Sequence, residues 1–230
     1  MVSASWSRYW FIALAALALF IPGCATRTAS VNMTDNNCPQ YQARLRKSIS
    51  DRQLIELDYA RSKGSSRQYY PAGSRLNLDQ REFTITSPMF MENDFTLSTA
   101  SIKWGVKPLQ MRWINLNVYA GLRGTLLEMD YMENALPRHL NNYSYGPTAS
   151  VEAVVPFLDS LSAEYRVTGS WLWMDNYTIS YTGQIILNFH PVSALELYGG
   201  WYIWEYQNSE HPSDINIELQ GPTLGMSLSF

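Results

Sequence analysis

The chain has 230 residues, a formal net charge of −3, and 17 Lys and Arg residues that form no dense cluster after the N-terminal region. This length allows one ordinary domain with targeting and linker segments, and the lack of a basic patch argues against a nucleic-acid partner. Aromatic residues make up 13% of the chain and charged residues only 16%, against roughly 25% charged in soluble domains. The composition indicates a surface that is not wholly in water.

The N-terminal residues are typical of a secretory signal peptide. Arg8 provides a positive charge, and the 12 residues from Trp10 to Ile21 are all apolar. This run is shorter than the roughly 20 residues of a transmembrane helix. We therefore expect cleavage, with residues 1–23 as the signal peptide.

Residues Ile21-Pro22-Gly23-Cys24 resemble the lipobox of bacterial lipoproteins, in which a small residue precedes the cysteine that becomes the lipidated N-terminus. The resemblance implies that Cys24 carries acyl chains such as palmitate and, because Ala25 follows it, that the product goes to the outer membrane. Pro22 departs from the usual pattern, so an ordinary signal peptide is the alternative. Cys38 would then have no partner in the monomer, and it either pairs between chains or stays free.

Residues 24–80 are expected to form a lipidated tether and periplasmic linker. Residues 25–38 are small and polar without periodicity, as in a flexible segment. Helix formers are frequent at 39–63, with apolar residues loosely in helical register, which predicts a short helix there. Gly64 would end this helix.

From Arg81 onward, apolar and polar residues alternate with period two, which predicts strands. Between Tyr177 and Phe189 the odd positions are apolar, whereas the even ones carry mostly hydroxyl and amide groups. The pattern predicts eight strands, at roughly 81–90, 95–106, 110–126, 145–156, 160–173, 177–190, 193–206 and 215–230.

The connections between these strands alternate in length. Short turns at 107–109, 157–159 and 191–192 contrast with longer loops at 127–144 and 207–214. Outer-membrane barrels have this asymmetry, with the short turns in the periplasm. With an even number of strands, both ends of the barrel are expected on the periplasmic side, next to the lipid anchor.

Six Trp residues lie near the ends of the predicted strands. An aromatic belt at the two membrane–water interfaces requires this placement, whereas Trp residues that fill a soluble core would show no such banding. The predicted aromatic girdle comprises Trp104, Trp113, Trp171, Trp173, Trp201 and Trp204.

The chain ends in Gly225-Met226-Ser227-Leu228-Ser229-Phe230, which resembles the C-terminal insertion signal of the small eight-stranded outer-membrane β-barrels through Met226, Leu228 and Phe230. The resemblance implies an all-β fold at residues 81–230. This would be an eight-stranded antiparallel up-and-down transmembrane β-barrel, inserted into the outer membrane of a Gram-negative bacterium by the barrel-assembly machinery. Activity does not follow from such a fold.

The polar faces of the strands would point into the barrel, where eight strands leave just enough room for side chains. We interpret the charged residues there as a paired network that fills the lumen. The alternative is a narrow polar channel. The residues are Glu82, Lys103, Arg123, Glu152, Glu164, Arg166 and Glu196.

The sequence predicts no cofactor and no metal site, because metal ligands are not clustered. His211 and Ser213 are weak catalytic candidates, since His-x-Ser resembles part of the motif of a lipid A deacylase barrel. A nucleophile and its base must be held within hydrogen-bond reach, and a polar loop with Pro212 does not provide this. We expect an ordinary surface loop.

We therefore expect a non-enzymatic structural or interaction protein that acts through its extracellular loops or its periplasmic segment. Its partners would be outer-membrane lipid, lipopolysaccharide or a protein at the loops. The alternatives are a lipid A hydrolase, a narrow channel for small solutes, and a bacterial lipocalin, whose Gly-x-Trp signature Gly200-Trp201-Tyr202 resembles. In that family the signature lies near the first strand, which argues against the lipocalin.

Overall fold

The computed structural model describes residues 31–78, 81–133, 136–173, 177–210 and 213–230. These residues form strands and no helix, which confirms the all-β class. Ten of the described strands form one sheet. They are β1 (Val31–Asp35), β2 (Gln40–Ser50), β3 (Gln53–Tyr70), β6 (Met89–Gln110), β7 (Asn115–Glu133), β8 (Leu136–Leu158), β9 (Leu161–Trp173), β10 (Tyr177–Val192), β11 (Leu195–Glu210) and β12 (Ser213–Ser229).

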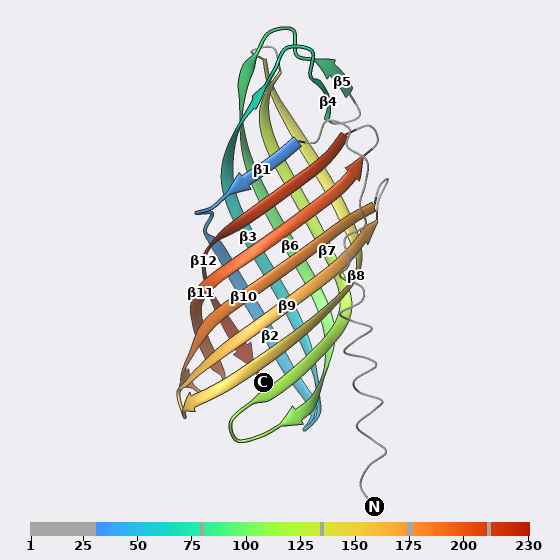
Figure 1. Ribbon diagram of the computed structural model, residues 1–230. Helices are drawn as coiled ribbons and strands as arrows, with labels where there is room; N and C mark the ends of the chain where they lie inside the picture. Colours follow the sequence, from blue (N-terminus) through green and yellow to red (C-terminus); the bar gives the residue numbers. More distant parts are fainter. Residues whose placement is uncertain (1–30, 79–80, 134–135, 174–176, 211–212) are drawn as a thin grey trace, which may run out of the picture.

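The sheet closes on itself because β12 pairs with strands on both of its edges (Figure 1). One edge is antiparallel to β11, and the other is parallel first to β1 and then to β2. Since β1 and β2 share one position, the ten strands of the described chain occupy nine positions in a closed, barrel-like ring. The expected eight-stranded, purely antiparallel ring is therefore wrong.

The break between β1 and β2 contains one extra residue relative to β12. Asp35 pairs with Leu219 and Gln40 pairs with Thr223. The chain therefore advances five residues from β1 to β2 while β12 advances four. The Asn37 amide donates to the Asp35 carboxylate at 2.9 Å, which turns the chain. Such a bulge bends a strand without ending the sheet.

A small hairpin of β4 (Arg75–Leu78) and β5 (Arg81–Thr84) lies outside the ring, at the upper end in Figure 1. Gly73 precedes it with a φ of 86°, a left-handed conformation that favours glycine. The predicted strand at 81–90 is therefore divided between this hairpin and the start of β6.

The expected helix at 39–63 and linker up to residue 80 are wrong. The segment supplies β2 and most of β3, which pair with each other across a tight turn. Its buried positions are polar, with Arg44 and Glu56 inside, whereas Leu45 and Leu57 face outward. The alternation was not recognised as a strand pattern, because the buried positions carry charged residues and strands were predicted from the spacing of apolar residues alone. Within the described residues, the ring thus begins at Val31.

The two ends of the barrel differ in their connections. The lower end in Figure 1 carries the short connections at 51–52, 111–114, 159–160 and 193–194, together with the end of β12. The upper end carries the start of β1, since Val31 pairs with Ile215 near the start of β12. The expectation that both chain ends lie on one side is wrong, because an odd number of ring positions places Val31 and Ser229 at opposite ends.

The interior changes character along the barrel. Toward the upper end it holds a hydrophobic core that includes Met91, Phe95, Leu127, Trp204 and Ile217. Toward the lower end it holds charged side chains that are at most 3% exposed, namely Arg44, Glu56, Lys103, Glu152, Glu164 and Arg166.

Candidate functional site: a charged interior and an apolar outer belt

The outward side chains of the lower part are predominantly apolar. Leu122 is 61% exposed and Ile185 is 64% exposed. Soluble monomers rarely expose contiguous apolar patches above a few hundred Å², but here every ring position contributes. We call this surface the outer belt; it includes Leu45, Leu57, Ile102, Leu122, Val151, Tyr165, Ile185, Leu197 and Leu224.

The outer belt ends part-way up the barrel, where both faces of the sheet change polarity. On β6 the outward residues pass from Ala100 to Ser98 and Thr96, while the inward residues become Leu97 and Phe95. β12 shows the same exchange near its middle. The upper part, which we call the collar, thus has the hydrophobic core and polar surface of a soluble barrel, and the lower part has the reverse.

Five of the six predicted girdle residues face outward. Their exposed fractions run from 45% for Trp173 to 65% for Trp113, with Trp104, Trp171 and Trp201 between these values. The assignment of Trp204 is wrong, because its side chain is 1% exposed and its Nε1 donates to Ser180 Oγ at 2.7 Å. Trp204 follows Trp201 by an odd number of residues, so the two lie on opposite faces.

Arg166 on β9 is the centre of the interior charge network. Its guanidinium donates to both carboxylate oxygens of Glu56 on β3, at 2.8 and 3.0 Å. It also donates to Glu152 and lies 3.2 Å from Glu164. Because β3 and β9 are not neighbours in the ring, these bonds cross the interior. Charge-assisted pairs of this forked kind are strong and geometrically specific.

Arg44 and Arg46 on β2 complete the same network from another side. Arg46 donates to Glu56 at 2.9 Å and to Glu152 at 2.7 Å. Arg44 donates to Glu164 at 2.8 Å and lies over the ring of Tyr198. Each of the three glutamates therefore contacts at least two cations.

Lys103 and Arg123 differ in their partners. Lys103 lies 3.2 Å from Glu56 and 3.5 Å from Asp58. Arg123 is 5% exposed, donates to Ser170 Oγ at 3.3 Å and lies near the Trp204 ring. Among the described residues, no carboxylate lies within ion-pair distance (4.0 Å) of Arg123, unlike the other interior cations.

Part of this network was predictable from the sequence. The structure brings together Lys103, Glu152, Glu164 and Arg166, and it buries Arg123 beside them with no ion pair to another described residue. The prediction missed Arg44, Arg46, Glu56 and Asp58, because residues 39–63 were interpreted as a helix. An alternation search with polar residues allowed at the buried positions would have found them.

Two predicted network residues lie elsewhere. Glu196 sits at the lower end, where His190 Nε2 is 3.0 Å from its carboxylate, and not within the buried network. Glu82 belongs to β5 in the separate hairpin, so it is not a ring residue, and its side chain lies outside the described part.

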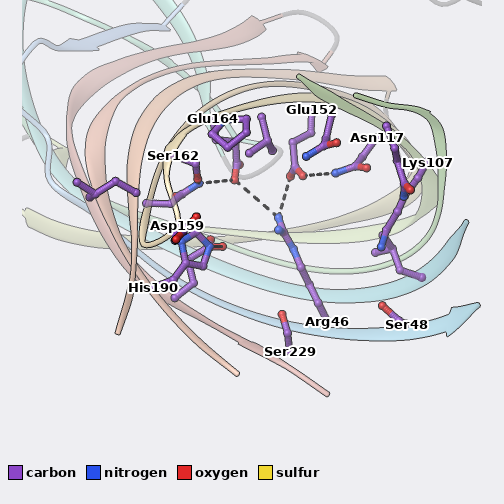
Figure 2. A pocket seen from close by; sticks show the side chains of 18 of the residues that line it. Arg46, Ser48, Lys107, Asn117, Glu152, Asp159, Ser162, Glu164, His190 and Ser229 are labelled. Carbon is purple, nitrogen blue, oxygen red and sulfur yellow. Dashed lines mark hydrogen bonds and ion pairs between the residues drawn. The ribbon is translucent and has the colours of Figure 1, made fainter. Parts of the chain in front are cut away.

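A pocket of about 520 Å³ opens at the lower end, beneath the network. Figure 2 shows Arg46 reaching from β2 toward Glu152 and Glu164 at its inner side, with Asn117 donating to Glu152 at 2.7 Å. The pocket therefore meets a layer of ion pairs, and the hydrophobic core lies beyond this layer. The interior therefore holds ion-paired side chains in its lower part and apolar side chains in its upper part.

The network offers little for acid–base catalysis, because its carboxylates are held by arginines and a general base needs a carboxylate that reaches its substrate. Among the described residues, no group of three or more His, Cys, Asp or Glu could hold a metal ion. Cys24 and His211 lie outside the described residues, and Ser213 is described only as the start of β12. No helix in the described ranges is long and apolar enough to cross a membrane.

Cys38 lies in the break between β1 and β2 and is a buried free thiol with 0% exposure. Its carbonyl accepts a hydrogen bond from the Tyr202 hydroxyl at 2.9 Å. An interchain disulfide needs an accessible sulfur, so the structure favours the free thiol over interchain pairing.

Comparison with known proteins gives no relative. No protein-family model, curated protein or solved structure matches the chain.

Proposed function

We propose that this chain is an integral β-barrel lipoprotein of the bacterial outer membrane, with a side-chain-filled lumen, that acts as an interaction protein through its collar. The observation that carries the proposal is the reversed polarity of the lower part, with an apolar outer belt around a charged interior. In hydrocarbon, backbone polar groups must be paired within the protein and outward side chains must be apolar. A closed ring with this belt meets both conditions.

The lengths of the strands support a projecting collar. A strand needs about 9–11 residues to cross a bilayer, whereas β6 has 22 residues and β8 has 23. At about 3.3 Å per residue, roughly half of each strand extends beyond the bilayer. The collar has its own hydrophobic core, so it would hold the upper loops rigidly above the membrane.

The short connections support an orientation with the lower end in the periplasm, as in other outer-membrane barrels. The collar and Val31 would then lie on the cell exterior. Cys24 precedes Val31 by seven residues, which span at most about 25 Å. An acylated Cys24 would therefore insert in the leaflet next to the collar, rather than on the periplasmic side as expected from the sequence.

The filled interior supports an interaction role over a channel. Arg166 and its partners cross the lumen, and the hydrophobic core occupies the barrel above them. A solute would have to break several charge-assisted bonds and then cross an apolar layer. We therefore expect no discrete conductance in planar-bilayer recordings of the purified protein.

The membrane assignment can be tested with two tryptophans on one strand. Variants that keep only Trp201 or only Trp204, with Phe at the other Trp positions of the mature chain, are folded into phosphatidylcholine vesicles whose acyl chains carry bromine. Bromine quenches tryptophan on contact, so Trp201 in the outer belt should be strongly quenched and the buried Trp204 only weakly. Equal quenching of both, or no quenching of Trp201, would contradict membrane insertion.

The orientation can be tested with single cysteines placed near the two opposite ends of β8. Asn141→Cys places a thiol on the exposed face of the collar, and Asp159→Cys places one in a lower turn. A membrane-impermeant maleimide on intact cells should label only the first, and the buried Cys38 should add little background. The reverse labelling would place the collar in the periplasm.

A further inference from the structure

The outer belt contains a groove of about 570 Å³ that spans β2, β3, β6, β7 and β8. These five strands are consecutive in the ring. The lining is almost entirely apolar, with Leu45, Leu57, Ile102 and Leu122 among its residues. The groove lies on the side of the ring to which the N-terminal strands β2 and β3 belong.

A cross-strand row of small and large residues explains the groove. Ala43, Tyr59, Ala100, Gly124 and Tyr145 are aligned directly across the five strands. Neighbouring strands lie about 4.8 Å apart, so Ala100 and Gly124 leave a gap two strands wide between the two tyrosines. A narrow gap with apolar sides fits a single acyl chain.

Two basic side chains lie directly above this row, at the edge of the collar. Arg61 and Lys63 follow Tyr59 on the same face of β3, about 7 and 13 Å higher. Both are exposed, and neither makes a hydrogen bond or ion pair with the described residues. In the ring, Ser98 lies opposite Arg61 and Thr96 opposite Lys63, so hydroxyl groups accompany the two cations.

We propose that the groove and this basic pair form a binding site for one acidic, phosphate-bearing lipid. An acyl chain lies between Tyr59 and Tyr145, and the phosphate contacts Arg61 and Lys63. Charge complementarity decides the class of occupant, because basic residues at the edge of an apolar surface attract anionic headgroups. The proposal depends on the membrane insertion proposed above, and it adds a defined lipid site to that function.

Native mass spectrometry of the mature chain, released from detergent micelles, tests the site with phosphatidylglycerol and phosphatidylcholine of identical acyl chains. The wild type should retain one phosphatidylglycerol in preference to phosphatidylcholine. Replacing Arg61 and Lys63 together by Ser should lower phosphatidylglycerol affinity about 30-fold, the effect of about 1 kcal/mol for each basic residue. Equal retention of both lipids by the wild type would overturn the proposal.

Gly124→Leu fills the groove and has a matched control in Gly183→Leu. A Cβ on Gly124 would meet only Ser144 O at 4.0 Å, and a Cβ on Gly183 would meet nothing within 4 Å. Both glycines face outward, but Gly183 lies on β10, away from the groove. Gly124→Leu should lose lipid retention and Gly183→Leu should keep it; equal retention by the two variants would contradict the site.

The two proposals fail in different ways. If the chain did not insert into membranes, bromine quenching of Trp201 would be absent in every variant. If only the lipid site were wrong, quenching of Trp201 would persist in the wild type while its preference for phosphatidylglycerol was missing.

Discussion

Replacing Arg166 by Met removes the central cation of the interior network while leaving a flexible apolar side chain in its place. In the wild type this guanidinium contacts Glu56, Glu152 and Glu164. After the substitution, these buried carboxylates lose a shared cation, although Arg46 and Arg44 still contact them. The variant therefore tests whether the network holds the lower barrel together.

The expected loss follows from the cost of an uncompensated buried charge. Removing one partner of a buried ion pair destabilises a protein by about 3–5 kcal/mol. Because each glutamate keeps another cation, we expect Arg166→Met to lie near the lower limit, at about 3 kcal/mol. This corresponds to roughly a hundredfold change in the unfolding equilibrium.

Arg123→Met is the matched control for this experiment. It is the same substitution in the same interior, but Arg123 has no carboxylate within ion-pair distance among the described residues. Removing the Arg123 guanidinium leaves no buried carboxylate without a cation. The free energy of unfolding of Arg123→Met should therefore lie within about 1 kcal/mol of the wild-type value or exceed it.

Urea unfolding of the three proteins in phosphatidylcholine vesicles, followed by tryptophan fluorescence, gives the free energies by linear extrapolation. If the two variants lost equal stability, the ion pairs would not be what stabilises the interior. If Arg166→Met were as stable as the wild type, the network would be energetically neutral.

Three further predictions concern single sites. The hydrogen bond between His139 Nδ1 and Asp130 (2.6 Å) raises the pKa of His139 above its usual range, so the pair is stabilising at low pH and this stabilisation is lost as pH rises through the raised pKa. Asp130→Asn should return the pKa of His139, followed by NMR, to the ordinary range, and an unchanged titration would contradict the assignment. Cys38 should react with maleimide only after unfolding, because its side chain is buried; rapid labelling of the folded protein would refute this. Gly146→Ala should prevent formation of the compact band that a folded β-barrel gives in an unheated gel sample, because a Cβ at Gly146 would overlap the carbonyl oxygen of Trp171 on β9. If the unheated variant migrated like the unheated wild type, the expected clash would be contradicted.

Strands were predictable from the sequence where one of their faces is uniformly apolar. β9, β10 and the lower half of β12 were located within a few residues, because apolar outward and polar inward side chains alternate there without interruption. The strands β2 and β3 were not predictable in this way, because Arg44, Glu56 and Asp58 occupy buried positions among residues that also favour helices.

The buried network was predictable only in part, for the same reason. Glu152, Glu164 and Arg166 were found because their strands were recognised and their parity was clear. Arg46 and Glu56 lie in the segment 39–63, which was predicted as a helix. From β2 and β3 they contact Glu152 and Arg166 on β8 and β9. No spacing rule connects residues so far apart in the chain.

The sequence by itself determined the all-β class, the alternation of the strands and the outward direction of five Trp side chains, including Trp104 and Trp201, because period two is a local property of the backbone. Only the tertiary structure decided the number of ring positions, since closure by β1 and β2 against β12 is a long-range pairing. Closure also decided that Val31 and Ser229 lie at opposite ends and that Trp204 lies inside. It brought Arg166 to Glu56 across the lumen, where charges from non-neighbouring strands meet only after the sheet has closed.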